Sequence, residues 1–247
     1  MKTTLLFDGG DRNFTLQSAI LVYADANSAA ATLHEIGQDH GRPFLKPGHP
    51  VTLDAVEELA VTLGKATGAT WLPENVVMLS AGKMAWWCPS GRRRIWFKPS
   101  HNDPERQAEL AVIKSLNGRY VWHPPLLFVT SYQRGHGSIH IYALTQDRRP
   151  RPGEALFNAP YWNLNAGGMC NGNLKLPDSP SPDNITAFEA AFFNSAFTHS
   201  SYGDQLTRHP GRHHGLWQEL AKRKTKPDAA YWRKVLVPAK TTANSVL

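Results

Sequence analysis

The sequence predicts an α+β fold in which an antiparallel β-meander packs on helices, with an N-terminal strand and helix extension ahead of it. Two observations support this prediction. Between residues 76 and 157, short apolar segments alternate with turn residues, which is typical of consecutive antiparallel strands. From Ile185 onward, aromatic and aliphatic residues recur at helical spacing, which indicates a helix with one face apolar enough to cover a sheet.

The N-terminal extension should begin with two strands, over residues 3–7 and 18–23, around the turn Asp8-Gly-Gly-Asp11. A helix is expected from Asp54, because Glu57 three positions later completes a capping box. The apolar residues of this helix fall on one face: Val56, Leu59, Ala60 and Leu63.

The meander should contain five strands, over residues 76–79, 84–87, 94–97, 126–130 and 139–144. The Ser90-Gly91 turn fits a tight hairpin that would pair Trp86 and Trp87 with residues 94–97. A short helix should begin at Asp103-Pro104 and end near Leu116.

The clearest helix follows a Pro- and Ser-rich segment and carries an apolar stripe at Ile185, Phe188, Phe192 and Ala196. Short helices are expected over residues 216–222 and 229–236, and residues 238–247 are expected to fray. We therefore expect three regions. They are an N-terminal strand and helix region over 1–75, a core over 76–205 and a basic C-terminal extension over 206–247.

The composition is that of a globular protein, because 247 residues with 41% hydrophobic content can bury a sizeable core. No apolar run approaches the roughly 18 residues of a membrane span. Asp8 and Asp11 interrupt the first apolar stretch too early for a signal peptide. We therefore expect a cytoplasmic protein that does not contact a membrane, with both cysteines present as thiols.

The chain is basic, with a net charge of +7 at pH 7 and an isoelectric point near 9.5. The positive charge gathers in residues 92–94, in residues 148–151, and in the C-terminal region at 222–224 and 233–234. Such charge favours an acidic partner, either nucleic acid or an acidic protein.

Cys170 is the main candidate for chemistry, because it ends the Gly- and Asn-rich segment Asn165-Ala-Gly-Gly-Met-Cys170. The preceding residues 156–163 run from a strand-like stretch into a turn, so the thiol should lie past a sheet and be accessible. The other cysteine, Cys88, directly follows Trp86-Trp87 and should pack in the core.

Three kinds of site can use such a thiol. In a cysteine hydrolase a histidine would activate it, but no one of the eleven histidines stands out. A metal site would combine a cysteine with His209, His213 and His214, but Pro210 and Gly211 argue against the required helix, and neither cysteine belongs to a Cys-x-x-Cys pair. The third is an acyl-carrier thiol without a base of its own, beside an oxyanion donor such as Asn163 or Asn165.

The order of these features resembles the catalytic half of the ubiquitin-conjugating enzyme fold, in which a β-meander leads through a His-Pro-Asn turn to the active cysteine. Pro160-Tyr-Trp-Asn163 stands where that turn is expected, so the resemblance assigns the oxyanion role to Asn163 with one position of slippage, or otherwise to Asn165. Ser181-Pro182 resembles the Ser-Pro of a loop in that family. Asp204-Gln-Leu206 resembles its Asp-Pro-Leu, which implies that Asp204 positions and deprotonates the incoming lysine.

A closer resemblance, spread over most of the chain, is to PRTRC system protein B, a bacterial ubiquitin-conjugating-like family encoded on plasmids and integrative elements. The strings that carry it are Met84-Ala-Trp-Trp87, Arg94-Ile-Trp-Phe97, His123-Pro-Pro-Leu-Leu-Phe128, Ile141-Tyr-Ala-Leu144 with Arg149-Pro150, Ala159-Pro-Tyr-Trp-Asn163, Gly168-Met-Cys170, Glu189-Ala-Ala-Phe-Phe193, Thr198-His199 and Leu206-Thr-Arg-His-Pro-Gly211. The resemblance implies three partners: a ubiquitin-like small protein, a ThiF-type activating enzyme and a JAB-type peptidase. We expect no cofactor and no metal.

The resulting hypothesis is a ubiquitin-conjugating-like carrier that accepts a ubiquitin-like protein as a thioester on Cys170 and passes it to an amine, with Asn163, Asn165 and Asp204 around the thiol. The alternative, from a different functional class, is a non-catalytic scaffold that recruits DNA or protein through its basic surface.

Overall fold

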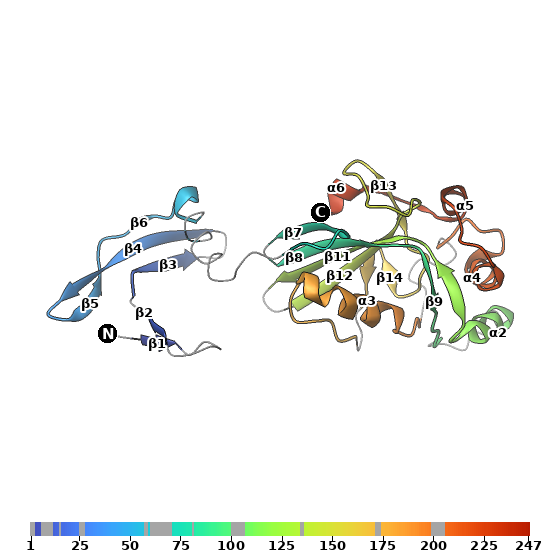
Figure 1. Ribbon diagram of the computed structural model, residues 1–247, viewed down its shortest axis with the longest axis horizontal. Coiled ribbons are helices and arrows are strands. Elements are labelled where there is room, and N and C mark those ends of the chain that lie inside the picture. The colour runs from blue at the N-terminus through green and yellow to red at the C-terminus, as the bar shows by residue number, and fades with distance from the viewer. Residues whose placement is uncertain are drawn as a thin grey trace. The chain divides into compact units, whose positions relative to one another are not determined.

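The computed structural model describes residues 3–5, 12–14, 16–24, 28–56, 59, 71–80, 82–99, 107–133, 136–170, 174–198 and 206–247. The chain divides into two compact units, Met1–Trp71 and Leu72–Leu247 (Figure 1).

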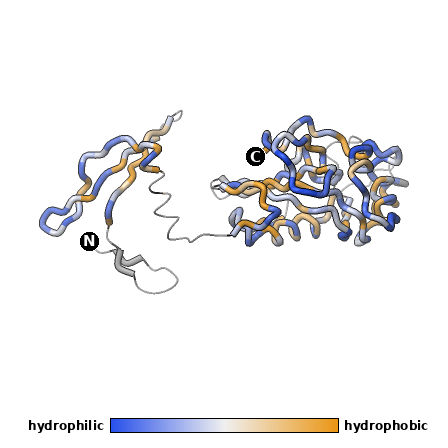
Figure 2. Tube along the Cα trace, turned by 45° about the horizontal axis from the view of Figure 1, so that its top comes forward, coloured by the Kyte–Doolittle hydropathy of each residue, from blue (hydrophilic) through white to orange (hydrophobic). Residues whose placement is uncertain are grey.

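The first unit consists mainly of antiparallel strands in its described part. Its strands are β1 (Thr3–Leu5), β2 (Arg12–Phe14), β3 (Ser18–Ala24), β4 (Ala29–Asp39), β5 (Arg42–Leu45) and β6 (His49–Pro50). β1 pairs with β2, and β4 pairs with β3, β5 and β6. β3 is apolar along most of its length (Figure 2). β1 confirms the described part of the strand expected over 3–7, and β3 confirms the one over 18–23. β2 and the strands from β4 to β6 were not predicted.

The helix expected from Asp54 falls largely outside the described residues. Residues 53–56 and 59 are helical, so the predicted start is correct to within one residue. The capping residue is Thr52, whose Oγ1 accepts from Ala55 N at 3.3 Å, and not Asp54. The first unit therefore contains a sheet followed by a helical segment. The sequence pattern did not predict the later strands of this sheet, β4 to β6.

The second unit is organised around one antiparallel sheet with the strand order β14-β15-β12-β11-β8-β7. Its strands are β7 (Val76–Ser80), β8 (Lys83–Cys88), β11 (Leu126–Gln133), β12 (His136–Ala143), β13 (Ala155–Asn158), β14 (Leu164–Asn165), β15 (Gly168–Met169) and β16 (Pro238–Thr242). β13 pairs with β12 on the same edge as β15, and β16 extends the sheet beyond β13. The strands expected over 76–79, 84–87, 126–130 and 139–144 are confirmed.

The hairpin expected around Ser90-Gly91 is wrong. β8 pairs with β7 and β11, while β9 (Gly91–Arg94) leaves the sheet and pairs with β10 (Tyr120–His123). Pro89 has no N–H for a sheet ladder. The next residue, Ser90, is buried and donates its N–H to Asp147 Oδ1 at 2.8 Å and its hydroxyl to His123 O at 2.8 Å. These bonds turn the chain away from β8 at this point.

Helices cover the sheet and its β9–β10 extension. They are α2 (Gln107–Leu116), the 3-10 turn η2 (Pro182–Asn184), α3 (Ile185–Phe193), α4 (Arg212–Lys222), α5 (Ala229–Val235) and α6 (Ala243–Val246). α3 buries Ile185, Phe188 and Phe192 along one face, as the apolar stripe predicts. Full burial of a phenylalanine side chain contributes about 2 kcal/mol, so this stripe is a major source of docking energy.

The two faces of the sheet carry separate apolar clusters, because successive side chains on a strand point to opposite sides. Trp86, Phe128 and Ile141 share a cluster with Phe188 and Phe192 of α3. The opposite face carries Ala85, Leu127, Val129, Tyr142 and Leu144, packed with Ala243 of α6. Figure 1 shows α3 and α6 on the two sides of the sheet.

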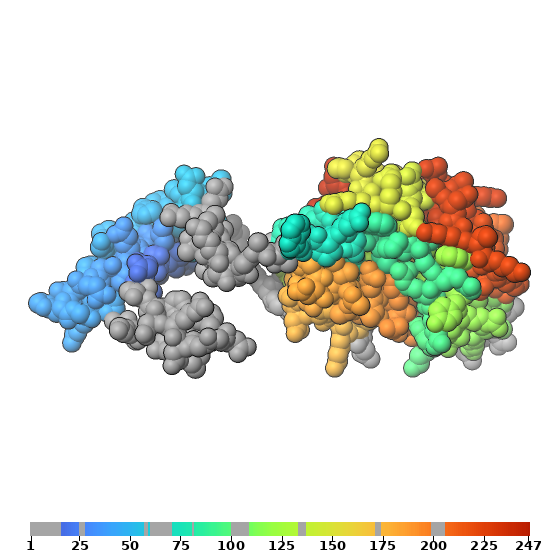
Figure 3. Space-filling model, in the orientation of Figure 1, coloured from blue at the N-terminus to red at the C-terminus, as the bar shows by residue number. Residues whose placement is uncertain are grey.

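Residues 238–247 do not fray, which corrects the sequence expectation. β16 pairs with β13 at Ala155↔Thr242 and Phe157↔Pro238. The N–H of Ala243 donates to Glu154 O at 3.0 Å, and the Ala243 side chain is buried. The end of the chain (red in Figure 3) therefore lies against the segment near residue 150 (yellow).

Candidate functional site

Cys170 directly follows a short hairpin built from β14 and β15. Leu164 pairs with Met169 and Asn165 with Gly168, which leaves only Ala166 and Gly167 in the turn. Both turn residues have positive φ, +47° and +82°. Two consecutive positive φ values define a type I′ turn, whose twist matches that of the flanking strands. The Gly-rich approach to the cysteine is thus a defined hairpin.

The hairpin is fixed to the edge of β12. The N–H of Ile141 donates to Gly167 O at 2.8 Å, and Tyr142 donates its hydroxyl to Ala166 O at 3.2 Å. A Cβ atom at Gly167 would lie 2.5 Å from the Tyr142 ring, closer than any ordinary contact. Glycine is therefore required at Gly167 both for its positive φ and for the close approach of Tyr142.

Cys170 is exposed, and its backbone is tied to the other strand of the hairpin. The N–H of Cys170 donates to Asn163 O at 2.8 Å, one step beyond the Leu164–Met169 pair. The hairpin hydrogen bonding thus continues to the cysteine itself. The exposure agrees with the expected position past the sheet. Because the amide of Cys170 is used in this bond, an oxyanion next to the thiol needs another donor.

Asn163 is buried, with a positive φ of +62°, a conformation that asparagine adopts more readily than most residues. Its Nδ2 donates to Ala196 O at 3.3 Å, and its Oδ1 accepts from Thr198 N at 3.0 Å and from Thr198 Oγ1 at 2.9 Å. The Asn163 carboxamide therefore holds the segment that follows α3 against the base of the Cys170 hairpin.

Asn165 is exposed and, in the part of the chain that the structure describes, its side chain makes no hydrogen bond. The strand pleat places it on the same side of the hairpin as position 170 and diagonal to it, a relation that separates two residues by about 7 Å. The Asn165 carboxamide is thus near the thiol and bonded to none of the described residues. Asp204, the fourth expected site residue, lies outside the described residues.

Two buried histidines hold the turn that precedes the hairpin. His123 Nε2 lies 3.2 Å from Arg93 O, and because a carbonyl oxygen can only accept a hydrogen bond, Nε2 carries the proton and donates it. Nδ1 is then the acceptor for the Tyr161 hydroxyl, at 2.7 Å. His213 stacks on Trp162 with ring centroids 5.3 Å apart, and its Nε2 accepts from Trp217 Nε1 at 2.9 Å. Burial lowers the pKa of both histidines from 6.5 to about 3, so both are neutral near pH 7.

His123 had no predicted role and His213 was considered only as a metal ligand, although the sequence carries a signal that each packs in the core. His123 is two residues after the buried Val121 in one strand, which puts both on the core face. His213 and Trp217 are four apart, which puts them on one face of α4.

The other histidines considered for a metal site have separate partners. His209 pairs with Glu219 at 2.9 Å, and His214 pairs with Glu109 at 3.3 Å. Of the residues that can be described, no three histidine, cysteine or acidic side chains are grouped as metal ligands would be. This arrangement gives no support to the metal alternative.

Cys88 is chemically protected, in contrast to Cys170. It is 1% exposed, and Arg93 Nη2 donates to its Sγ at 3.1 Å. Burial, followed by the charge of Glu189, raises the pKa of the Cys88 thiol to about 12. The expectation that Cys88 packs in the core is confirmed, and a thiol with so high a pKa is a poor nucleophile at neutral pH.

An antiparallel sheet, a cysteine beyond its edge hairpin and a following helix that packs on the sheet are consistent with an α+β protein of the E2-like class. The family model described as prokaryotic E2 family D matches residues 53–239, and the chain belongs to this family. No match is found among the curated proteins or among the solved structures. None of the described helices is long and apolar enough to cross a lipid bilayer.

Proposed function

We propose that the protein is a bacterial ubiquitin-conjugating-like carrier that holds a ubiquitin-like protein as a thioester on Cys170. The observation that carries the proposal is the exposed Cys170, fixed by its backbone to Asn163 at the end of the β14–β15 hairpin, in a chain of an E2 family. A carrier thiol must be reachable by two large partners in turn. An exposed sulfur at a sheet edge meets this requirement, whereas Cys88 does not.

Loading is a transthioesterification. The Cys170 thiolate attacks the thioester carbonyl that links the ubiquitin-like protein to an activating enzyme; the new C–S bond forms and the old one breaks, which returns a thiolate to the activating enzyme. Transfer follows when a lysine amine attacks the Cys170 thioester. A C–N bond forms, the Cys170 thiolate leaves, and the amine proton passes to a base, which we propose to be Asp204.

The tetrahedral intermediate of each step carries an oxyanion that needs a hydrogen-bond donor. We propose Asn165 as this donor, because its exposed carboxamide lies diagonal to Cys170 and makes no hydrogen bond to a described residue. Asn163 would act mainly by positioning, since its carboxamide is bonded to Ala196 and Thr198. Loss of the Asn165 donor should slow transfer about a hundredfold.

Within the E2-like class, we propose membership of the PRTRC system, on the strength of the sequence strings that resemble PRTRC system protein B. The partners would be a ubiquitin-like small protein, a ThiF-type activating enzyme that loads Cys170, and a JAB-type peptidase that removes the modifier. These assignments rest on the resemblance and make the activating enzyme the first partner to test.

The decisive experiment is trapping with the activating enzyme, nucleotide and the ubiquitin-like protein. Wild-type protein should form an adduct that a reducing agent cleaves, Cys170→Ser an ester that survives reduction, and Cys170→Ala no adduct. Cys88→Ala is the matched control and should load like wild type, because Cys88 is buried. An adduct on Cys170→Ala, or none on wild type, rules out the carrier function.

A non-catalytic scaffold is the second candidate, favoured by the net charge of +7. It predicts DNA binding that weakens steeply with salt and a biological phenotype that Cys170→Ala leaves intact. Loss of the phenotype in Cys170→Ala, with the protein still folded, would exclude it.

A further inference from the structure

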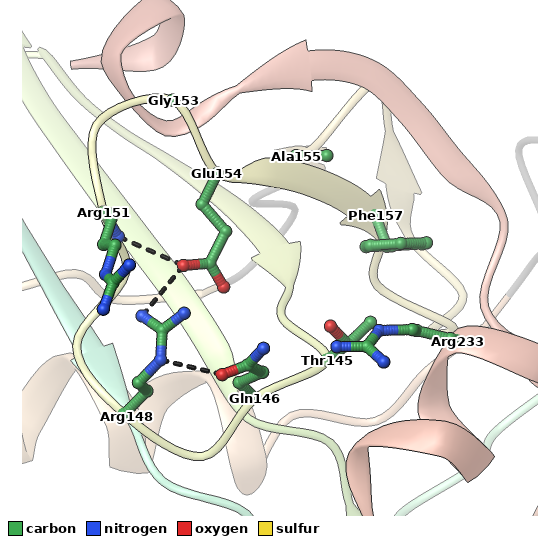
Figure 4. Close-up of a pocket in the computed structure, with 9 residues that line it drawn as sticks. All are labelled: Thr145, Gln146, Arg148, Arg151, Gly153, Glu154, Ala155, Phe157 and Arg233. Carbon is green, nitrogen blue, oxygen red and sulfur yellow. Dashed lines mark hydrogen bonds and ion pairs between the residues drawn. The ribbon is translucent and has the colours of Figure 1, made fainter.

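A second candidate site lies on the same unit, just beyond the C-terminal end of β12. This is the end of the strand that is farther from Cys170. It is a cavity of about 540 Å³ between the segment 145–155, Phe157 of β13 and Arg233 of α5 (Figure 4). Gly168 pairs with His140, and Thr145 of the cavity is five residues further along the chain. At about 3.3 Å per residue, roughly 16 Å separates Thr145 from the position paired with Gly168, and Cys170 lies further away because β15 is antiparallel to β12, so the cavity is separate from Cys170.

The cavity brings together two basic clusters that are far apart in the sequence. Arg148 and Arg151 line it from the segment between β12 and β13, and Arg233 enters from the last turn of α5. Figure 4 shows Arg148 and Arg151 on one side of the cavity and Arg233 on the other, near Thr145. The fold thus concentrates positive charge that the sequence distributes over separate regions.

This charge is only partly neutralised. Glu154 Oε2 accepts from Arg148 Nη1 at 3.0 Å and from Arg151 N at 3.1 Å, and Gln146 Oε1 accepts from Arg148 Nε at 2.8 Å. These bonds fix the Arg148 guanidinium in place. With respect to the described residues, the guanidinium groups of Arg151 and Arg233 have no acidic partner. Three arginines therefore face one carboxylate.

The geometry indicates the kind of ligand. A guanidinium binds a carboxylate with two parallel hydrogen bonds. Here the positive groups lie on opposite sides, with Phe157 on the same side as Arg233 (Figure 4). A ligand that fits both sides carries two separated anionic groups with an apolar part between them. A peptide with acidic side chains around an apolar residue has this pattern. The cavity volume is in the usual range for sites that bind a ligand the size of a few residues.

A nucleic acid backbone fits less well, because it needs a continuous track of unpaired positive charge. The charge here does not form such a track, because Glu154 neutralises Arg148 and the adjacent Asp147 binds Lys226. We infer that the cavity binds an acidic peptide segment of a partner protein, with one carboxylate on Arg233 and another on the Arg148 and Arg151 side.

The test measures binding to the full chain by fluorescence anisotropy, with a labelled peptide in which glutamate and leucine alternate. Its glutamine counterpart and a labelled DNA duplex are the comparison probes. The glutamate peptide should bind best, and Arg233→Gln should weaken it about tenfold, the effect of losing one charge-assisted pair. Lys234→Gln removes the same charge from the next, exposed position of α5, outside the cavity, and should change affinity less than about twofold.

Three outcomes would overturn the inference: no binding of the glutamate peptide to wild type, equal binding of the glutamine peptide, or equal effects of Arg233→Gln and Lys234→Gln. If the protein binds DNA but not the peptide, and Arg233→Gln abolishes that binding, the ligand of the cavity is a nucleic acid and the peptide inference is wrong. Circular dichroism of each variant checks that it is folded. Because Cys170 loading is assayed separately, failure here leaves the carrier proposal untouched.

Discussion

Acidification should destabilise the second unit, because His123 and His213 are buried as neutral imidazoles around the 160–163 turn. In the unfolded chain each imidazole takes up a proton below its ordinary pKa of 6.5. In the folded chain it does so only near the lowered pKa of about 3. Between these values the unfolded state binds more protons, so the free energy of unfolding rises with pH and falls as the solution is acidified.

The size of the effect follows from the two pKa values. At about pH 5 protonation stabilises the unfolded chain by about 2 kcal/mol per histidine, while the folded chain gains almost nothing. The two residues together should therefore remove about 4 kcal/mol between about pH 7.5 and pH 5. Glu219, whose pKa is lowered from 4.5, contributes at lower pH. The pKa of the partly buried His140 is also lowered by burial and adds to the loss in this window.

The assay is urea unfolding followed by tryptophan fluorescence, which reports on the second unit because Trp86, Trp217 and Trp232 are buried there. His213→Gln keeps an acceptor for Trp217 and should lose about half of the pH effect. His49→Gln, at an exposed position of the first unit, should lose none. A wild-type loss below about 1 kcal/mol, or a full loss retained in His213→Gln, would refute the buried neutral state.

Three further predictions concern the hairpin and the thiols. Gly167→Ala should destabilise the second unit by about 2 kcal/mol or more in the same urea assay, because it combines a positive φ with a contact against the buried Tyr142 ring; Gly153→Ala, where a Cβ meets nothing within 4 Å, is the matched control. Ala166→Asn should stabilise by about 0.5 kcal/mol, since Asn-Gly suits a type I′ turn, and an unchanged or lower unfolding midpoint would contradict that turn assignment. Iodoacetamide should label Cys170 in the folded protein and Cys88 only after unfolding, as peptide mass spectrometry can verify; equal labelling in the folded state would contradict their different exposure.

Local pattern predicted the elements whose partners lie nearby in the chain. The continuous apolar run of β11, the alternation in β12 and the apolar stripe of α3 are all short-range signals. β4 was missed because its alanine-rich start has low strand propensity, and its pairing with the strongly apolar β3 supplies the missing preference.

Long-range contacts explain the remaining differences. The Ser90 corner depends on Asp147, and the order of residues 238–247 depends on pairing with β13, so no local signal specifies either. At the candidate site, the Gly-rich segment indicated an accessible Cys170. The contacts of Asn163 with Ala196 and Thr198, which distinguish it from Asn165, require the folded path of the chain after α3.

The hydrogen bond from the Cys170 amide to Asn163 O holds the cysteine through the main chain. The position of Cys170 therefore does not depend on the side chains around its thiol. The main chain of the hairpin sets where the thiol is, so exposed neighbours such as Asn165 can be exchanged without displacing it. In the proposed carrier, single surface substitutions on this constant frame would therefore change the acceptor preference and the transfer rate. The same frame makes Cys170 a suitable attachment point for probes that report on partner binding.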